Sequence, residues 1–363
     1  MRIAVDARPF EERPTGAGRV LGGLLPAWRR SFPDDDFVLL SPRRVHLPYS
    51  LAGDTGIAVR TGPPLPGTLW LQTVAAGAAR RTGSDVLLGT LAIVPAASTF
   101  PSVALVHDLT PLLFPGWHSR KNRLGFVPFL ASTVRRARKI ATVSAATQHD
   151  LLLLFPDAAE KTFVVPNGLT PAPEDPGGPE PNDGRPYVLF LGTLEPRKNL
   201  PRLVKAMETI WDRSPEFPDL LLAGGEGWGL PGFTDALARS RHAGRIRRLG
   251  WTAEGESARL IRRARLLAYP SLYEGFGLPP LEAMALGTPV VGSSSSSLPE
   301  VIGDAGLLPD PESVPEIVAA LRRANDDEAW RADARARGIE RARAFTWQAS
   351  ATRLRALCAE AIP

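Results

Sequence analysis

Two acidic residues, Glu274 and Glu282, are separated by seven residues that include Gly275 and Gly277. Carboxylates are good acceptors for the hydroxyl groups of a sugar. Glycines let backbone N–H groups approach a ligand closely, and the N-terminus of a helix predicted to begin at Pro279-Pro280 favours an anion. The pattern therefore predicts a site for a ligand that carries both hydroxyl groups and negative charge, such as a nucleotide sugar.

The elements around this segment place it at one end of a sheet. The apolar run 266–269 predicts a buried parallel strand, so Glu274 lies beyond its carboxyl end, where ligands bind in open α/β sheets. Glu282 falls in the first turn of the following helix, which Gly287 would end. Each acid also has an interpretation without a ligand, in which Glu282 complements the helix dipole and Glu274 is an ordinary loop acid. The occurrence of both acids in one short segment favours the interpretation in which they bind a ligand.

The spacing of these acids and the residues around them resemble the retaining nucleotide-sugar transferases of glycosyltransferase family 4. Further segments resemble this family in the same order along the chain, at 106–111, 141–144, 187–200, 220–225, 248–251, 289–293, 298–301 and 303–307. The resemblance covers most of the chain and is closest to the bacterial mannosyltransferase-like branch that builds surface polysaccharides. It implies the GT-B fold, with two Rossmann-like, doubly wound parallel-sheet domains that face a central cleft.

The apolar runs by themselves predict a parallel α/β protein, because strand-like segments alternate with helical ones. Strands are predicted at 2–7, 37–41, 57–60, 85–89, 103–107, 140–143, 163–165, from Tyr187 onwards, and at 220–223, 246–249, 266–269 and 290–291. A chain of 363 residues is long enough for two domains of this kind.

The domain boundaries follow from composition. The segment 170–186 is rich in Pro, Gly and Asp and lacks apolar periodicity, so it is predicted as a linker between domains 1–169 and 187–344. The segment 345–363 is predicted to form a final helix, which the resemblance implies crosses back to the N-terminal domain. By the same resemblance, the N-terminal domain binds the acceptor and the C-terminal domain binds the nucleotide sugar.

Arg197 and Lys198 follow a predicted strand and the turn at Gly192. An Arg fork and a Lys point charge suit phosphate oxygens, and the resemblance places the diphosphate of the donor here. Both cations would then stabilise the negative charge that grows on the leaving group, so neither a metal nor a cofactor is expected. The alternative is a solvated basic pair in a turn.

Other donor contacts are expected around Gly275-Phe276-Gly277-Leu278 and, by resemblance, at Gly16, Gly18, Gly250 and Trp251. The segment 14–19 follows the first strand, where family 4 enzymes place a glycine loop that closes over the donor. A Gly-x-Gly pair also occurs in ordinary tight turns, and the full fingerprint of nicotinamide-dependent enzymes is missing at this distance from the strand. Hydride transfer is therefore the weaker hypothesis.

His107 ends the apolar run 103–106 and precedes Asp108. Its place at a strand end favours contact with the donor sugar or the acceptor, and Asp108 could orient it or bind the acceptor. The alternative is a structural His-Asp pair that satisfies backbone groups. The run 34–36 is Asp-Asp-Asp, but it precedes a strand and is better explained as a solvated turn than as a metal site.

The formal net charge of +5 and a pI near 9.7 favour an anionic partner. No zinc spacing, RNA-binding motif or recognition helix indicates nucleic acid. Apolar and basic residues alternate at 119–130 and 134–139, as in segments that lie against anionic lipid, although an ordinary helix with outward arginines has the same pattern. No apolar run approaches the ~20 residues of a membrane span, so a cytoplasmic protein is expected, with peripheral contact at the inner face of the cell membrane as an option. Cys358 is the one cysteine and is expected to be a packed thiol.

These observations together predict a retaining, metal-independent hexosyltransferase that acts in polysaccharide biosynthesis. The donor implied by the resemblance is GDP-mannose, and the acceptor is a hydroxyl of a glycan or glycolipid. Glu274 would hold the sugar and Glu282 the ribose, while His107, Arg197 and Lys198 would complete the catalytic group. The alternatives are a nucleotide-sugar epimerase or phosphorylase on the same fold, and a non-catalytic nucleotide-sugar-binding subunit.

Overall fold

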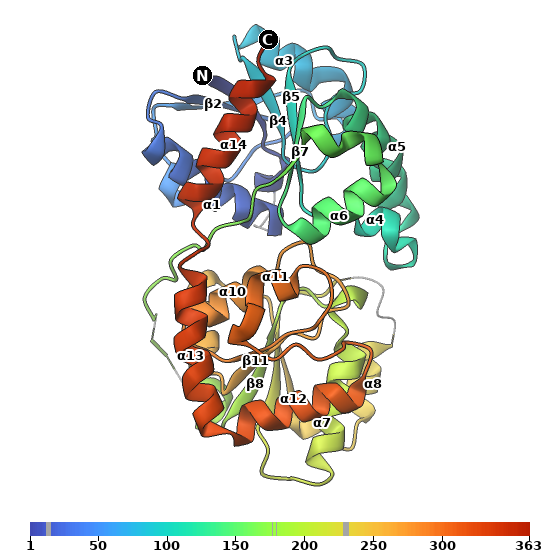
Figure 1. Ribbon diagram of the computed structural model, residues 1–363, viewed down its shortest axis with the longest axis vertical. Helices are drawn as coiled ribbons and strands as arrows, with labels where there is room; N and C mark the ends of the chain where they lie inside the picture. The colour runs from blue at the N-terminus through green and yellow to red at the C-terminus, as the bar shows by residue number, and fades with distance from the viewer. Residues whose placement is uncertain (12–15, 176, 179, 228–231) are drawn as a thin grey trace. The chain divides into compact units, whose positions relative to one another are not determined.

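The computed structural model describes the chain except for residues 12–15, 176, 179 and 228–231, and the side chains at 49, 121 and 122. The chain forms two compact units: residues 1–168 together with 345–363, and residues 169–344. Each unit contains a parallel β-sheet with helices packed on it (Figure 1). The predicted α/β class is confirmed.

Seven parallel strands form the sheet of the first unit, in the order β3-β2-β1-β4-β5-β6-β7. They are β1 (Arg2–Asp6), β2 (Asp36–Ser41), β3 (Ile57–Thr61), β4 (Val86–Gly89), β5 (Ser102–Val106), β6 (Lys139–Thr142) and β7 (Thr162–Val164). Ile3 of β1, an interior strand, is in register with Phe37 on one side and Val86 on the other. The residues of β4 and β5 are buried, as expected for apolar strands covered on both faces.

The helices of the first unit are α1 (Gly16–Ser31), α2 (Gly67–Trp70), α3 (Ala76–Arg81), α4 (Thr110–Leu113), α5 (Arg120–Arg136), α6 (Ala145–Leu154) and α14 (Trp347–Ala361). Short helical segments lie at η1 (Arg8–Phe10), η2 (Tyr49–Leu51), η3 (Leu71–Ala75), η4 (Pro115–Trp117) and η5 (Pro156–Lys161). The last helix, α14, begins after Thr346, whose Oγ1 accepts a hydrogen bond from the backbone of Ala349. It packs against α1, where a Cβ on Gly23 would lie 2.2 Å from the Trp347 ring.

Asp35 joins the N-terminus, α1 and α14. Its carboxylate accepts hydrogen bonds from the Met1 ammonium at 2.9 Å, Trp28 Nε1 at 2.9 Å and Arg355 Nε at 2.7 Å. The prediction of a solvated turn at 34–36 holds for the exposed Asp34 and is wrong for Asp35, which is 1% exposed. Two of its three donors, Met1 and Arg355, lie 34 and 320 residues away along the chain, so local composition carried little sign of its burial.

Five parallel strands form the sheet of the second unit, in the order β10-β9-β8-β11-β12. They are β8 (Tyr187–Leu191), β9 (Asp219–Ala223), β10 (Ile246–Gly250), β11 (Leu266–Ala268) and β12 (Val290–Val291). All twelve predicted strands are present, with ends that differ from the prediction by no more than one residue.

The helices of the second unit are α7 (Leu200–Trp211), α8 (Phe233–Arg239), α9 (Glu254–Arg263), α10 (Leu278–Ala285), α11 (Leu298–Ile302), α12 (Val314–Asp326) and α13 (Glu328–Ala342). Short segments lie at η6 (Pro181–Gly184), η7 (Pro196–Lys198), η8 (Ala243–Arg245) and η9 (Gly303–Ala305). The segment 170–186 belongs to this unit, and Arg259 of α9 donates hydrogen bonds to the carbonyl oxygens of Gly177 and Gly178. Within the described part of the chain, no helix is both long and apolar enough to cross a bilayer.

Candidate active site

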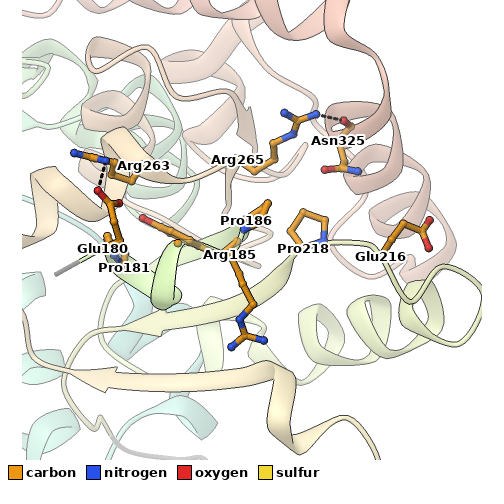
Figure 2. Close-up of a pocket in the computed structure, with 11 residues that line it drawn as sticks. Glu180, Pro181, Arg185, Pro186, Glu216, Pro218, Arg263, Arg265 and Asn325 are labelled. Carbon is orange, nitrogen blue, oxygen red and sulfur yellow. Dashed lines mark hydrogen bonds and ion pairs between the residues drawn. The ribbon is translucent and has the colours of Figure 1, made fainter.

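The strands of the second unit have a cavity at their amino ends. It measures about 470 Å³, and its lining includes Pro186 before β8, Pro218 before β9 and Arg265 before β11 (Figure 2). Each arginine of the lining has its own protein acceptor: Arg185 pairs with Asp219, Arg263 with Glu180, and Arg265 donates to the carbonyl oxygen of Asn325. Ligands of open parallel sheets bind at the carboxyl ends of the strands, which is the end of this sheet opposite the cavity.

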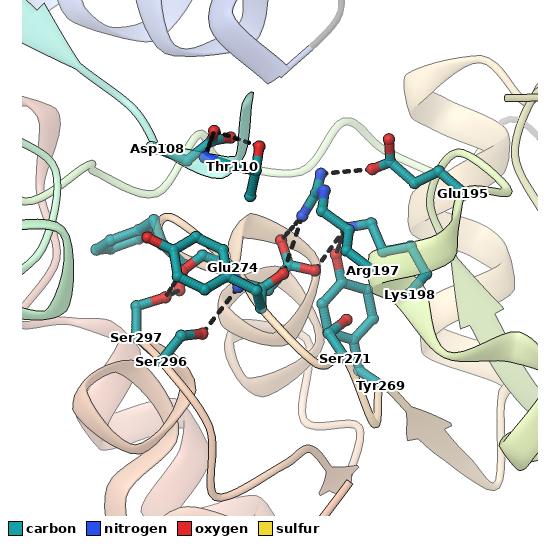
Figure 3. A network of polar contacts seen from close by, with 12 residues as sticks. Asp108, Thr110, Glu195, Arg197, Lys198, Tyr269, Ser271, Glu274, Ser296 and Ser297 are labelled. Atoms are coloured by element: carbon teal, nitrogen blue, oxygen red, sulfur yellow. Dashed lines mark hydrogen bonds and ion pairs between the residues drawn. The ribbon is translucent and has the colours of Figure 1, made fainter. Parts of the chain in front are cut away.

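Glu274 lies on the loop between β11 and α10, at the carboxyl end of the sheet. A run of serines, 293–297, holds this loop by its backbone (Figure 3). Ser296 Oγ accepts from the Glu274 N–H at 2.8 Å, and Ser297 Oγ donates to the carbonyl oxygens of Glu274 and Phe276. Because these hydroxyl groups satisfy the loop's polar backbone, the loop can pass through a buried region in one defined conformation.

The side chain of Glu274 forms ion pairs with both predicted cations. Its Oε2 lies 2.5 Å from Arg197 Nη1, and its Oε1 lies 2.7 Å from Lys198 Nζ. Lys198 also donates a hydrogen bond to the hydroxyl group of Tyr269. The side chains of Glu274 and Lys198 are 6% and 5% exposed, whereas that of Arg197 is 22% exposed. Arg197 is therefore the more accessible of the two cations.

Glu195 completes this group from the residue before η7. Its Oε1 lies 2.6 Å from Arg197 Nη2, so each terminal nitrogen of the guanidinium faces a different carboxylate (Figure 3). We call Glu195, Arg197, Lys198 and Glu274 the four-charge cluster. The segment that contains Arg197 is held to the Glu274 loop by a backbone hydrogen bond from Leu272 N to Arg197 O at 2.8 Å.

The cluster keeps Glu274 ionised. Burial by itself would raise the pKa of this carboxyl, but the charges of Arg197 and Lys198 outweigh burial and lower its pKa to about 2. Burial and the negative charge of Glu274 raise the pKa of Tyr269 well above its ordinary value. At neutral pH the cluster therefore contains a carboxylate at Glu274 and a neutral phenol beside it.

Glycines allow the loops at this end of the sheet to pack backbone to backbone. A Cβ on Gly224, which follows β9, would lie 2.0 Å from the carbonyl oxygen of Gly192, which follows β8. Gly250 ends β10 with a φ of 73° and accepts a hydrogen bond from Gly224 N. Trp251, which was predicted to contact the donor, follows Gly250 and is 53% exposed.

The start of α10 differs from its prediction. The helix begins at Leu278, after Gly277 with a φ of 112°, and the predicted prolines occupy its next two positions. Glu282 is the fifth helical residue, so the prediction that it lies in the first turn is wrong. It lies in the second turn and is half-buried. The interpretation in which it complements the helix dipole is correspondingly weaker, because that effect is confined to the first turn.

In the first unit, His107 directly follows β5. Its Nε2 lies 2.9 Å from the carbonyl oxygen of Thr90, which can only accept, so Nε2 carries the proton and Nδ1 of the neutral ring is an acceptor. Burial lowers the pKa of His107, against smaller opposing effects of Thr90 and Asp108. The histidine is therefore a neutral imidazole near pH 7.

Asp108 has a local partner. Its Oδ1 accepts from the backbone N–H of Thr110 at 3.0 Å and from the Thr110 hydroxyl at 2.7 Å, at the start of α4 (Figure 3). This geometry fits the structural alternative, in which the aspartate satisfies backbone groups. Gly16 and Gly18 are the first and third residues of α1, and a Cβ on Gly16 would meet nothing within 4 Å. Pro14 and Thr15 of the predicted glycine loop lie outside the described residues.

Three features were not predicted. Glu195 lies within the segment 187–200, which resembles the family, but no contact was predicted for it, and no role was predicted for the serine run. The third is a buried ion pair at the end of β1, where Arg8 Nε and Nη2 donate to Asp6 at 2.8 and 2.6 Å. Thr90 Oγ1 donates to the Asp6 carbonyl oxygen at 2.6 Å, which connects this pair to the residue that holds His107. A D-x-R pattern after the first strand was the available sequence signal.

Among the residues that the structure describes, no group of three or more His, Cys, Asp or Glu side chains could hold a metal ion.

Solved structures show the same fold. HepE from Anabaena, in complex with UDP and glucose, superposes with a TM-score of 0.73, at 20% identity and with 99% of this chain and 100% of that chain covered. Two Rossmann-like parallel-sheet units of this kind define the GT-B class of glycosyltransferases.

Sequence comparison specifies the family. Residues 172–345 match the family described as glycosyl transferases group 1. The chain is 34% identical over 256 residues to O-antigen chain mannosyltransferase B of Escherichia coli, across 68% of this chain and 67% of that protein. It is 30% identical over 337 residues to the MMP alpha-(1->4)-mannosyltransferase of Mycolicibacterium hassiacum, across 83% of this chain and 76% of that protein. The chain belongs to the group 1 glycosyltransferases, and the resemblance found in its motifs is confirmed.

Proposed function

We propose that this protein is a retaining glycosyltransferase that transfers mannose from a nucleoside diphosphate to a hydroxyl group of a glycan or glycolipid. The observation that carries the proposal is the four-charge cluster at the carboxyl ends of β8 and β11. It combines an ionised acid, which can accept from sugar hydroxyls, with an accessible arginine, which can bind phosphate oxygens.

On this proposal the donor lies along the carboxyl end of the second sheet. Arg197 contacts the diphosphate. The charge of the buried Lys198 also stabilises the diphosphate, and the ion pair of Lys198 with Glu274 holds Glu274 in place. Glu274 and the backbone of 275–278 hold the hexose, and Glu282 accepts from the ribose hydroxyls. Gly192 and Gly250 let the chain approach the nucleotide, and the exposed face of Trp251 lies beside the base. The positive charge of Arg197 and Lys198 favours departure of the diphosphate, without a metal ion.

On this proposal the acceptor binds at the N-terminal unit. The neutral His107 presents Nδ1 as an acceptor, which suits contact with a sugar hydroxyl. No protein nucleophile is assigned to the anomeric carbon. The acceptor hydroxyl therefore attacks from the face that the diphosphate leaves, and a phosphate oxygen of the leaving group takes its proton. This sequence of events retains the configuration of the sugar.

The relatives favour mannose as the sugar, since both are mannosyltransferases. One of them acts on an O-antigen chain, which supports a surface glycan as the acceptor and the cytoplasmic face of the membrane as the place of action. GDP is the proposed carrier, while the UDP bound to HepE makes UDP the competitor to test. An epimerase or phosphorylase on this fold, and a nucleotide-sugar-binding subunit without turnover, are the alternative functions.

The decisive experiment has two stages. Thermal unfolding is followed with GDP, UDP, ADP and dTDP, because a ligand at ~100 times its dissociation constant adds roughly 2.7 kcal/mol of stability. The sugar conjugate of the preferred nucleotide is then incubated with a mannose-containing acceptor, with and without EDTA, and the anomeric configuration of the product is read by NMR. A product with inverted configuration, or turnover that EDTA abolishes and magnesium restores, contradicts the proposed mechanism. Sugar interconversion without transfer identifies an epimerase, and nucleotide binding without any reaction identifies a binding subunit.

A further inference from the structure

Glu195 is the member of the four-charge cluster to which the proposed function assigns no part in donor binding. Its Oε1 lies 2.6 Å from Arg197 Nη2, and its side chain is 6% exposed. The other terminal nitrogen of the guanidinium lies 2.5 Å from Glu274 Oε2 and 3.3 Å from the Tyr273 carbonyl oxygen. Arg197 is thus held between two carboxylates, as Figure 3 shows.

The charges of the cluster cancel. Arg197 and Lys198 supply two positive charges, and Glu195 and Glu274 supply two negative charges. A diphosphate carries at least two negative charges, so it would approach a group that has no net positive charge. The affinity of the site for a diphosphate therefore depends on the two carboxylates as much as on the two cations.

The two carboxylates are not equivalent. Glu274 binds both cations, one with each oxygen, and its backbone is held by Ser296 and Ser297. Glu195 is paired with Arg197, the cation that is 22% exposed and can be reached by a ligand. An arginine edge that faces a carboxylate has the geometry that also suits a phosphate, so a phosphate oxygen and Glu195 would compete for the same guanidinium.

We propose that Glu195 is a positioning residue that holds Arg197 in place and lowers the affinity of the site for diphosphates. This role rests on the proposed function. In that function the nucleoside diphosphate is the product that must leave after each transfer, so a lower affinity for it is useful. A site with two uncompensated cations would retain that product. Glu195 offsets part of their charge, so that the diphosphate is released and Arg197 remains oriented for the next donor.

The experiment compares Glu195→Gln and Glu195→Ala, which both remove the charge, with Glu195→Asp, which keeps it. The ligands are GDP, UDP and inorganic pyrophosphate, which contains the charged part of the nucleotide alone, and dissociation constants are measured by calorimetry. Glu216→Gln is the matched control, because it removes the same charge from an exposed residue before β9, at the opposite end of the sheet. Melting temperatures confirm that each variant is folded.

Both neutral variants are expected to bind pyrophosphate and the preferred nucleotide about tenfold more tightly than the wild type. Glu195→Asp and Glu216→Gln are expected to stay within about twofold of it. Product inhibition should strengthen by the same factor in the neutral variants. A purely structural role for Glu195 would weaken binding instead, so unchanged or weaker binding in the neutral variants overturns the inference. If the wild type binds neither nucleotide nor pyrophosphate, the proposed donor site itself is wrong. That result is distinct from unchanged or weaker binding in the neutral variants, which overturns only the role of Glu195.

Discussion

Glu274 and Arg197 form an ion pair in which Oε2 and Nη1 are 2.5 Å apart, beside a second pair between Glu274 and Lys198. The acid assigned to the sugar and the cations assigned to the diphosphate are therefore one electrostatic unit. Removing any member leaves the others with uncompensated charge in a buried place. Substitutions in this cluster are expected to affect both stability and turnover.

The first prediction concerns Glu274→Gln. Loss of its charge leaves Lys198, which is buried, without its carboxylate, so the free energy of unfolding should fall by about 3 kcal/mol. Turnover should fall by roughly ten- to a hundredfold in kcat, because a charged hydrogen bond to the sugar is lost. Urea unfolding and steady-state kinetics with the identified donor measure the two effects. Wild-type kcat in this variant would remove Glu274 from the mechanism.

The second prediction concerns the pH dependence of the stability that Glu274 contributes. The pKa of Glu274 is lowered from 4.5 to about 2 in the folded protein, so its stabilising contribution is complete above pH ~4.5. The contribution, about 3 kcal/mol, is lost as the pH falls from ~4.5 towards 2. The difference in unfolding free energy between the wild type and Glu274→Gln should therefore be constant from pH 5 to 7 and shrink below it. A constant difference down to pH 3 would contradict the lowered pKa.

The third prediction separates Glu282 from Glu274. A ribose does not change during the reaction, so a contact to it is the same in the ground and transition states. Glu282→Gln should raise the KM for the donor by roughly tenfold and leave kcat within about twofold. Its melting temperature should change little, because Glu282 is half-buried in the second turn of α10. A fall in kcat at unchanged KM would assign Glu282 to the reacting centre instead of the ribose.

The fourth prediction concerns His107, whose pKa is lowered by burial. The folded protein takes up this proton less readily than the unfolded chain, so the contribution of His107 to stability is complete above pH ~6.5 and is lost as the pH falls through its lowered folded pKa. His107→Gln can still donate to the Thr90 carbonyl oxygen but does not titrate. Its stability should therefore depend less on pH between 7 and 5 than that of the wild type. His149→Gln, at an exposed position of α6, is the control for replacing a histidine by glutamine.

The fifth prediction tests contact with anionic membranes. Leu124 in the first half of α5 is 72% exposed and follows the exposed Arg123, whereas Leu130 and Val134 in the second half are buried in the core. Only the first half therefore presents an apolar side chain together with a basic one. Arg123→Gln combined with Leu124→Ser should weaken binding to vesicles that contain anionic lipid and leave nucleotide binding unchanged.

Arg135→Gln combined with Arg136→Gln is the control for this fifth prediction. It removes two exposed charges at the other end of α5, where the apolar side chains are buried. If the two double variants bind anionic vesicles equally well, α5 is an ordinary helix of the domain with outward arginines. The side chain of Lys121 lies outside the described residues and is not part of the test.

Most of the strands could be predicted because their residues are apolar on both faces. Runs such as Tyr187–Leu191, which is buried throughout, have few other stable environments, whereas β10 contains two arginines and was predicted from a weaker apolar pattern. The start of α10 was less accurate, because Leu278 and Pro279 are both compatible with a first helical position. That difference of one position moved Glu282 from the first turn to the second.

The candidate site was predictable where its residues belong to one short segment. Glu274, with the glycines that follow it, was found from spacing, and Arg197 and Lys198 were found from their place after a strand. Their pairing with one another was not visible, because the chain between 198 and 274 has to fold before these side chains meet. The serine run that holds the Glu274 loop was missed for the same reason.

The sequence by itself determined the α/β class, the positions of the strands and which charged residues stand at their carboxyl ends, since these depend on local apolar patterns and motif spacing. Only the tertiary structure decided the partners of those charges. In the folded protein Glu195 and Glu274 face the two terminal nitrogens of the Arg197 guanidinium. Asp35 is buried and paired with Arg355, and His107 is hydrogen-bonded to Thr90. The physical reason is that the energy of a charge depends on its burial and on neighbours within a few ångströms. Those neighbours include Thr90, 17 residues from His107 along the chain, and Arg355, 320 residues from Asp35.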